Sequence, residues 1–308
     1  MSSRPAAVLL ALDWGTSSAR AYRLGAGGVV LGRREAALGV MQVPPGGYPA
    51  ALRTLLGDWA DLRLPRIASG MVGSRQGWLE VPYAECPANV ADLTPRIRVT
   101  PDREMSIVPG LVYRDAGGVP DVMRGEETQV IGAVDAENPG ALAVLPGTHS
   151  KWVRVESGRI LGFRTYMTGE LYGVLLRHSI LGRLAEAPDG AALHPVAFAD
   201  GVAAGLASDD VTHVIFGART RCLLGELPPA EVGDWLSGVL IGYEIASARR
   251  WASATLQRAT PVQIIGTDVL VERYQVALSL ADVHSTATEP EAAARGLYLI
   301  AQRAGIVQ

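Results

Sequence analysis

One pattern occurs twice in the chain, and it restricts the fold more than any other sequence feature. Residues 9–24 (LLALDWGTSSARAYRL) and 142–158 (LAVLPGTHSKWVRVESG) each combine an apolar strand, a polar Gly-Thr turn and an alternating strand. A supersecondary unit that repeats half a chain apart predicts two similar lobes. The turn-forming residues near 134–139 suit a linker, so we expect one lobe over 1–135 and another over 136–308.

The remaining patterns predict an α/β protein with a mixed sheet flanked by helices in each lobe. Helical spacing of apolar residues occurs at 48–62, 125–135, 170–186, 232–251 and 290–304. We expect a strand at 66–70, a buried strand over 105–113, and a strand at 211–217 (VTHVIFG). Residues 261–278 are typical of a strand, a glycine turn and a helix.

Composition excludes several classes of protein. The chain has 308 residues, of which 48% are hydrophobic, and a net charge of −3. These values argue against disorder and against a nucleic-acid partner, which requires a basic surface. No apolar stretch is long enough to span a membrane. Cys86 and Cys222 cannot build a disulfide framework. We therefore expect a cytoplasmic protein without membrane or nucleic-acid partners, and the sequence leaves a homo-oligomer open.

The two Gly-Thr turns carry the groups that bind phosphate. Backbone N–H groups at a glycine turn and nearby hydroxyls suit phosphate oxygens. Asp13 ends a predicted buried strand, where a carboxylate can hold Mg²⁺ through water. Neither turn matches the Walker A or the GxGxxG pattern. The candidate phosphate ligands are Gly15, Thr16 and Ser17 in the first turn, and Gly147, Thr148, His149 and Lys151 in the second.

Two further features extend this site. Gly266 and Thr267 lie between a predicted strand and a helix, where the backbone lets the flat ring of adenosine approach. Lys151 is the only lysine among 28 basic residues, and its compact ammonium could neutralise phosphate charge. Each feature has a simpler explanation. Gly266 and Thr267 could form an ordinary strand-to-helix turn, and the scarcity of lysine could reflect the codon usage of a GC-rich genome.

The order of these segments resembles the actin, sugar kinase and Hsp70 superfamily. Several segments are more similar to the 2-dehydro-3-deoxygalactonokinase family: ALDWGTSSARAY, GMVGSRQGW, RGEETQ, LPGTHSKWV and MTGELY. The resemblance covers about residues 8–300. It implies a two-lobed actin-like ATPase fold with the nucleotide in the cleft. It also implies ATP- and Mg²⁺-dependent phosphorylation of the terminal C6 hydroxyl of 2-dehydro-3-deoxy-D-galactonate in galactonate catabolism.

The resemblance also places catalytic and substrate-binding residues. Asp13 would hold the Mg²⁺ water shell, and Glu126 or Glu127 would take the proton of the sugar hydroxyl, with Asp121 as a third candidate. Both glutamates also suit a helix N-terminus for purely structural reasons. The substrate carboxylate requires a cation, and an arginine in a Gly-rich loop suits it best. Candidate substrate-binding residues are Ser74, Arg75, Gln76, Trp78, Thr168 and Glu170. For each of them a purely structural role is the alternative interpretation.

Three other functions stay open on the sequence alone. One is a kinase for another sugar or sugar acid, including the gluconate epimer. The second is a non-kinase ATP-binding switch protein of the actin type, which needs no polar substrate loop such as GSRQGW. The third is a phosphatase of the same fold, in which water replaces the sugar hydroxyl.

Overall fold

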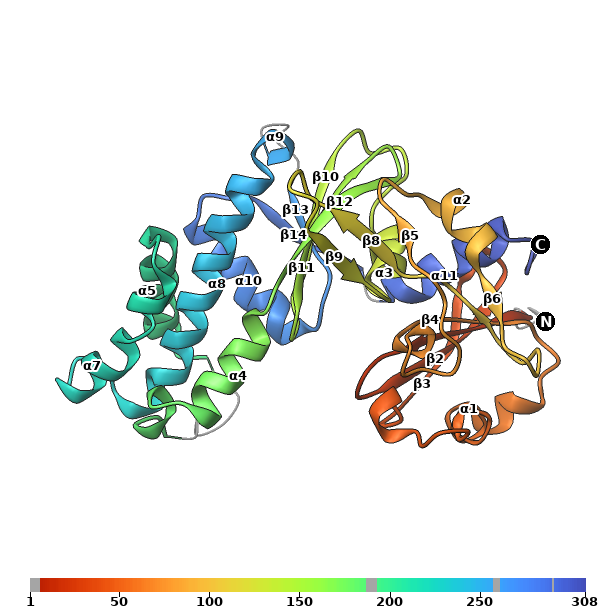
Figure 1. The fold of residues 1–308 in the computed structure, drawn as a ribbon, viewed down its shortest axis with the longest axis horizontal. Coiled ribbons are helices and arrows are strands. Elements are labelled where there is room, and N and C mark those ends of the chain that lie inside the picture. Colours follow the sequence, from red (N-terminus) through yellow and green to blue (C-terminus); the bar gives the residue numbers. More distant parts are fainter. Residues whose placement is uncertain (1–5, 187–192, 257–260, 290) are drawn as a thin grey trace, which may run out of the picture. The chain divides into compact units, whose positions relative to one another are not determined.

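A computed structural model describes residues 6–186, 193–256, 261–289 and 291–308 (Figure 1). The chain forms two compact units: 1–139 with 155–163 and 289–308, and 140–154 with 164–288. The sequence analysis placed everything after 135 in a second lobe. In the structure the C-terminal helix and the far ends of two strands pack in the first unit instead.

The first unit is built on a six-stranded sheet and a three-stranded sheet. The large sheet has the strand order β3-β2-β1-β4-β7-β6, and the small sheet has the order β5-β8-β9. The elements are β1 (Ala7–Trp14), β2 (Ala19–Gly25), β3 (Val30–Ala36), α1 (Tyr48–Leu56), β4 (Arg66–Gly70), β5 (Ala84–Glu85), α2 (Val90–Leu93), β6 (Arg98–Val99), β7 (Ser106–Ile107), β8 (Leu111–Arg114), β9 (Pro120–Met123), α3 (Glu126–Ala133) and α11 (Ala292–Arg303).

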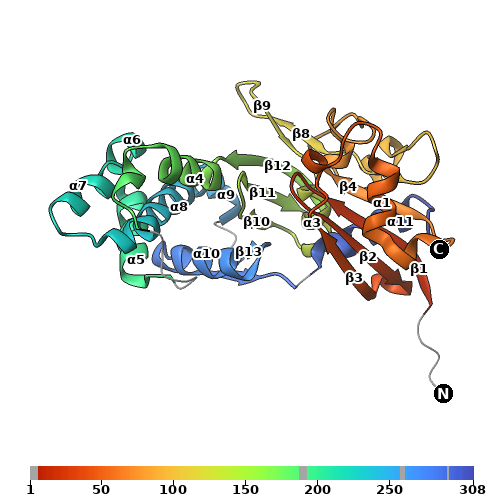
Figure 2. The ribbon, with the colours of Figure 1, turned by 90° about the horizontal axis from the view of Figure 1, so that it is seen from below.

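Helices cover both faces of the large sheet. Leu10, Leu12 and Trp14 of β1 pack in one core cluster with α1, and α11 contacts β1, β2 and β4. α11 lies on the face of this sheet opposite to α1 (Figure 1), and Figure 2 shows β1, β2 and β3 of the sheet side by side. α11 also packs tightly on α3, where a Cβ at Gly132 or Gly296 would lie under 3.0 Å from backbone of the other helix. The C-terminus therefore completes the first unit.

The second unit contains a five-stranded sheet with helices packed against it. Its strand order is β12-β11-β10-β13-β14, so the first four positions repeat the order of the first sheet, as the internal repeat predicts. The elements are β10 (Ala141–Leu145), β11 (Ser150–Glu156), β12 (Arg159–Tyr166), α4 (Thr168–His178), α5 (Pro195–Ala207), α6 (Val211–Val214), α7 (Gly217–Leu223), α8 (Val232–Trp251), α9 (Ser253–Leu256), β13 (Val262–Ile264), α10 (Asp268–Leu280) and β14 (Ser285–Ala287).

The two helices α5 and α8 lie in backbone contact. Each has two glycines four residues apart at the crossing: Gly201 and Gly205 on α5, and Gly238 and Gly242 on α8. A Cβ at any of them would lie under 3.0 Å from a carbonyl oxygen of the partner helix. These glycines therefore permit a helix separation that no larger residue allows.

Four local predictions differ from the structure, one of them the helix expected over 170–186, which ends at His178 as α4. Residues 211–217 were expected as a strand because they are β-branched, but Asp210 caps a short helix there by accepting from His213 N at 3.2 Å. The strand expected over 105–113 is two strands in different sheets, because Pro109 and Gly110 separate β7 from β8. The helix expected over 48–62 ends at Leu56, where Gly57 adopts a positive φ.

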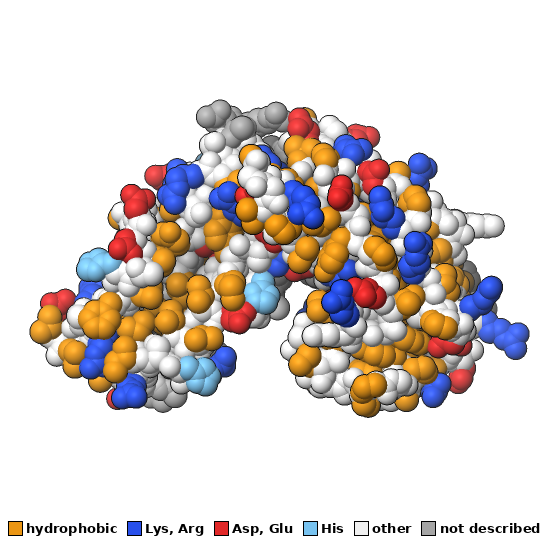
Figure 3. Space-filling model, viewed as in Figure 1, with side chains coloured by type: hydrophobic (Ala, Val, Ile, Leu, Met, Phe, Trp, Pro, Cys, Tyr) orange, Lys and Arg blue, Asp and Glu red, His pale blue; other side chains and the backbone are white. Residues whose placement is uncertain are grey.

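The surface agrees with the near-neutral composition. Basic and acidic side chains are interspersed over the face in Figure 3. Within the described residues, no helix is both long enough and apolar enough to span a membrane.

Candidate active site

Carboxyl groups gather at the carboxyl end of β1 in the first unit. β1 and β4 are parallel, with Asp13 opposite Ser69 and Trp14 opposite Gly70. The Asp13 side chain is 13% exposed, and Arg20 Nη1 lies 3.6 Å from its Oδ2. The pKa of Asp13 is raised to about 6, mainly by burial; Arg20 opposes the shift, and the charge of Glu126 contributes to it. Asp13 thus lies close to Glu126.

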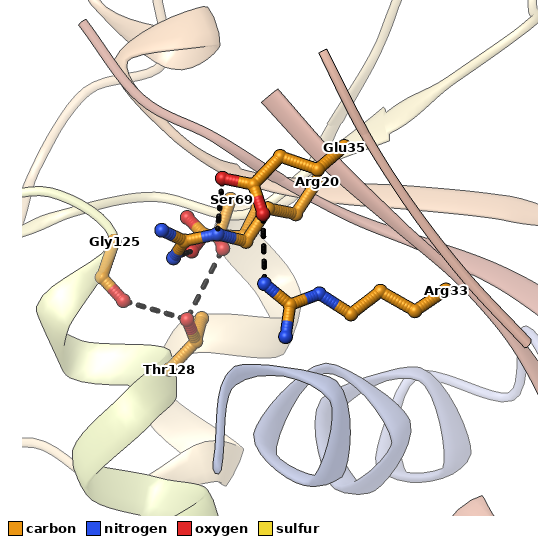
Figure 4. Close-up of polar contacts among 7 residues, drawn as sticks. Arg20, Arg33, Glu35, Ser69, Gly125 and Thr128 are labelled. Carbon is orange, nitrogen blue, oxygen red and sulfur yellow. Dashed lines mark hydrogen bonds and ion pairs between the residues drawn. The ribbon is translucent and has the colours of Figure 1, made fainter. Parts of the chain in front are cut away.

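Two glycines bring the start of α3 to this strand end. Gly125 has φ of 111°, and a Cβ there would lie 3.1 Å from Gly70 Cα and 3.9 Å from Asp13 Oδ1. Thr128 Oγ1 donates to Gly125 O at 2.6 Å and lies 3.1 Å from Ser69 Oγ (Figure 4). The helix N-terminus is therefore fixed against β4 by buried hydroxyls.

The adjacent glutamates at this helix start have different environments. Glu127 is fully buried, and its Oε2 accepts from Gly125 N at 2.7 Å. Its Oε1 has no hydrogen-bond partner within the described residues. The pKa of Glu127 is raised from 4.5 to about 8, mainly by burial and in part by the charge of Glu126. Glu126 is only partly buried, and its Oε2 accepts from Arg124 N at 2.9 Å.

Asp121, the third candidate base, lies on β9 rather than at the helix start. Its Oδ1 accepts from Val122 N at 2.8 Å. Asp13, by contrast, is part of a charged group on neighbouring strands. Arg20 of β2 and Arg33 of β3 both contact Glu35, at 3.2 and 2.7 Å (Figure 4). Arg20 therefore shares its charge between Asp13 and Glu35.

Backbone hydrogen bonds hold the first Gly-Thr turn in place, and two of its side chains are exposed to solvent. Gly15 N donates to Ser18 O at 2.9 Å, which closes the turn. Val40 N and Met41 N donate to the carbonyls of Gly15 and Thr16 at 3.0 and 3.2 Å. Thr16 and Ser17 are exposed. The Thr16 and Ser17 side chains are therefore accessible to solvent, whereas the N–H of Gly15 is used within the turn.

The loop after β4 separates its predicted substrate residues into two groups. The Arg75 side chain is 87% exposed and lies 3.5 Å from Glu80, and Gln76 is exposed. Trp78 instead stacks on Tyr48 at 5.8 Å within the core cluster, which favours the structural role for this ring. Ser74 Oγ is buried and has no partner among described groups.

The second Gly-Thr turn, in the second unit, is braced by the start of α4. Thr148 and His149 are exposed, and Glu170 N donates to Thr148 O at 3.0 Å. His149 Nε2 contacts Glu170 Oε2. Lys151 is 4% exposed, and its Nζ donates to His149 O at 3.1 Å. The lone lysine therefore supports the turn from its buried side.

A cavity of about 180 Å³ adjoins this turn within the second unit. Gly147 and Thr168 line it, so the structure brings these two predicted residues together. Gly266 and Thr267 are not among its lining residues and lie exposed at the start of α10. The other lining residues come from α4, α8 and α10: Gly169, Tyr172, Ser237, Leu240, Ile241, Leu270, Arg273 and Tyr274.

The α10 wall of this cavity carries a fixed cation that the sequence analysis missed. Arg273 donates to Asp234 Oδ1 at 2.8 Å and to Ser237 Oγ at 3.2 Å. Asp234 Oδ2 also accepts from His194 N at 2.9 Å. Burial opposes ionisation of Asp234, but these hydrogen bonds prevail and lower its pKa. No local motif marks this group, because its members are far apart in sequence.

Arg124 was also missed, although it precedes Gly125 in the RGEETQ segment. It is 9% exposed, and its Nη2 donates to Val81 O at 2.8 Å. Its guanidinium lies 4.2 Å from the centre of the Tyr83 ring. Its charge lowers the pKa of Glu127, against the larger effect of burial. An arginine one glycine ahead of two adjacent glutamates was the available sequence signal.

The donor set near Asp13 fits magnesium held through water. Within the described residues, no group of three or more His, Cys, Asp or Glu side chains could enclose a metal. Mg²⁺ commonly keeps several waters and uses one or two protein carboxylates together with substrate phosphates. A nearby cation would also favour the ionised form of Asp13, which burial disfavours. One carboxylate beside a solvent-exposed glycine turn supplies the protein's part of such a site.

Comparison with known proteins decides the family. The model of the 2-keto-3-deoxy-galactonokinase family matches residues 13–300. The chain belongs to the 2-keto-3-deoxy-galactonokinase family.

Two curated relatives match this family member over most of their length. A probable 2-dehydro-3-deoxygalactonokinase of Rhizobium meliloti (strain 1021) is 38% identical over 299 residues, which is 96% of each chain. The 2-dehydro-3-deoxygalactonokinase of Escherichia coli (strain K12) is 37% identical and covers 92% of this chain and 94% of its own. The chain is therefore a member of a carbohydrate kinase family.

Solved structures agree with this assignment. A crystal structure from Sinorhizobium meliloti, whose description carries the name 2-dehydro-3-deoxygalactonokinase, has a TM-score of 0.85 at 37% identity. It covers 96% of this chain and 98% of its own. A xylulose kinase from Lactobacillus acidophilus has a TM-score of 0.52 at 11% identity, covering 97% and 90%, which shows a shared fold only. The family member thus has the actin-like ATPase fold, as expected from sequence.

Proposed function

We propose that the chain transfers the terminal phosphoryl group of ATP to the C6 hydroxyl of 2-dehydro-3-deoxy-D-galactonate. The products are the 6-phosphate and ADP, in galactonate catabolism. Two relatives with 37 and 38% identity bear this enzyme name. The structural observation that carries the proposal is the carboxyl cluster of Asp13, Glu126 and Glu127 beside an exposed glycine turn. Phosphoryl transfer requires these parts: a base, a metal carboxylate and phosphate ligands.

In this proposal Glu126 accepts the proton of the sugar hydroxyl. A general base must come within hydrogen-bond reach of that proton, and Glu126 is partly exposed whereas Glu127 is fully buried. The hydroxyl oxygen forms a bond to the γ-phosphorus, and the bond from that phosphorus to the ADP oxygen breaks. Glu127 supports the helix start through Gly125 N.

Asp13 holds the water shell of Mg²⁺, which when bound supplies charge neutralisation at the phosphates. Thr16 and Ser17 of the first turn donate to phosphate oxygens, and Gly15, whose N–H is bound to Ser18 O, lets the turn backbone come close to them. Gly147, Thr148 and His149 donate to phosphate oxygens from the second turn, which Lys151 supports. Backbone N–H groups and hydroxyls at such turns stabilise developing charge without reorganising.

The nucleoside occupies the cavity of the second unit in this proposal. Its volume of about 180 Å³ is below that of a site for a whole drug-sized ligand, so it suits one ring system. Gly266 and Thr267 then contribute exposed backbone near the rim rather than the main contacts. In the first unit, Arg75 extends into solvent and offers a guanidinium for the sugar-acid carboxylate.

A coupled ADP-release assay with a panel of sugar acids tests the proposal. We expect ATP turnover that depends on 2-dehydro-3-deoxygalactonate and exceeds turnover with the gluconate epimer. Stronger stimulation by another sugar acid would favour a related kinase. ATP hydrolysis that ignores every sugar acid would contradict the kinase function and favour a nucleotide switch or a phosphatase.

A further inference from the structure

A buried carboxylate on α8 lies beneath the second turn and the cavity wall. Glu244 is 1% exposed and accepts four hydrogen bonds from three other elements. Its Oε1 accepts from Ser150 Oγ and from Trp152 Nε1, both at 2.7 Å. Its Oε2 accepts from Tyr274 OH at 2.9 Å and from Thr168 Oγ1. β11, α4 and α10 therefore meet at one side chain.

The number and type of donors match an ionised carboxylate. Two oxygens can accept about four hydrogen bonds, and Glu244 accepts two at each. An indole N–H donates only, so Trp152 requires an acceptor at this position. Burial raises the pKa of Glu244 above its ordinary value, and its hydrogen bonds, that from Thr168 first, offset this only in part. A carboxylate with every acceptor position filled is fixed in one orientation.

Three of the four donors belong to, or directly adjoin, parts that we assign to nucleotide binding. Thr168 and Tyr274 line the cavity, and Ser150 directly follows His149 of the second turn. Tyr274 OH also lies 3.3 Å from Ser150 Oγ. One side chain thus connects the cavity wall to the end of the phosphate turn.

We propose that Glu244 is a positioning residue that holds the second turn and the cavity wall in the geometry that binds the nucleotide. The inference rests on the proposed function, because it assumes a nucleotide at this site. Glu244 does not line the cavity and would act only through its four donors. Its effect is therefore confined to nucleotide binding and leaves the sugar acid unaffected.

Glu244→Gln is the sharpest test because it keeps the shape and removes the charge. Its amide nitrogen cannot accept hydrogen bonds, so two of the four charge-assisted hydrogen bonds are either lost or replaced by weaker, reversed ones to hydroxyl oxygens. Hydrogen bonds to charged groups contribute enough that we expect ADP to bind about tenfold more weakly or worse. The KM for ATP rises in parallel, and the KM for the sugar acid stays within about twofold. Calorimetry with ADP and Mg²⁺, with steady-state kinetics, measures both.

Single-donor variants keep the test decisive if Glu244→Gln does not fold. Tyr274→Phe removes one donor from Oε2 and should also weaken ADP binding, by less than Glu244→Gln. Tyr166→Phe is the matched control, since this hydroxyl lies 3.2 Å from Ser247 Oγ in the same unit and makes no hydrogen bond with Glu244. We expect it to bind ADP as the wild type does.

The outcomes separate this inference from the proposed function. If the wild type binds no ADP, the proposed function itself fails. If the wild type binds ADP and folded Glu244→Gln or Tyr274→Phe binds it equally well, the positioning role is wrong. A loss of affinity for ADP and for the sugar acid together would indicate general destabilisation and would also overturn the inference.

Discussion

At the scale of single residues, burial distinguishes two adjacent glutamates that the sequence leaves equivalent. Glu127 is fully buried at the start of α3, and its pKa is raised to about 8, so it is mostly protonated at neutral pH. Glu126 is partly exposed beside Asp13. Their chemistry should differ accordingly.

We expect Glu126→Gln to lower kcat by about 10²–10⁴-fold, the usual contribution of a general base. Glu127→Gln replaces a protonated acid with a group of similar shape, so turnover at pH 7 should stay within a few-fold of wild type. Steady-state kinetics with both variants at saturating ATP measures this. The reverse pattern would assign the base to Glu127, and two active variants would exclude both.

The stability of the protein should depend on pH through Glu127. Its folded pKa of about 8 exceeds the ordinary value of 4.5, so the folded state binds a proton more tightly than the unfolded state. The contribution of Glu127 to stability is therefore fully present below about pH 4.5, and this contribution is lost as the pH rises to about 8.

Glu127→Gln removes this titration. The free energy of unfolding of the variant, relative to wild type, should increase with pH by at most about 1.4 kcal/mol per pH unit between pH 5 and 8. Urea unfolding at several pH values measures the difference. A difference that stays constant across this range would show that Glu127 ionises normally in the fold.

At the scale of elements, local patterns predict the strands and turns well. The two strand–turn–strand segments and helix α8 agree with the structure because their signals lie within one element. α5 was not anticipated, since its small residues serve a contact with α8 that only tertiary packing creates. Likewise Asp13 ends a recognisable strand, whereas Glu244 is 92 residues from Trp152 and no spacing rule connects them.

The contact between α5 and α8 makes a stability prediction. Gly201→Ala or Gly238→Ala places a methyl group against a backbone carbonyl, which cannot move as a flexible side chain can. We expect each variant to lose about 1–3 kcal/mol of unfolding free energy, the usual cost of overpacking. Thermal and urea unfolding report it.

Gly173→Ala on α4 is the matched control for this prediction. Its Cβ would contact only the far end of the flexible Arg177 side chain. Alanine also favours helix more than glycine by about 0.5–1 kcal/mol, so this variant should be as stable as wild type or more so. Equal losses in all three variants would show that helix separation is not set by the glycines.

At the scale of the whole molecule, repetition of one sheet topology gives each unit its own glycine turn. In the proposed function both turns contact phosphate, and the units differ in their other parts: the first holds the carboxyl cluster and Arg75, and the second holds the cavity. The sequence predicts the repeat, but it does not predict that the C-terminal helix α11 belongs to the first unit, because its partner α3 is distant from it in sequence.

This division predicts that the two Michaelis constants can be changed separately. Leu270→Trp fills part of the cavity and should raise the KM for ATP about tenfold, with the KM for the sugar acid unchanged. Leu280→Trp is the control, because Leu280 is 48% exposed at the end of α10 and does not line this cavity.

Arg75→Ala should raise the KM for the sugar acid and leave the KM for ATP unchanged, since a lost ion pair to the carboxylate is equivalent to about tenfold or more in affinity. Initial rates measured over a grid of ATP and sugar-acid concentrations give both KM values for each variant. A parallel rise of both KM values in Leu270→Trp or in Arg75→Ala would contradict separate binding of the two substrates.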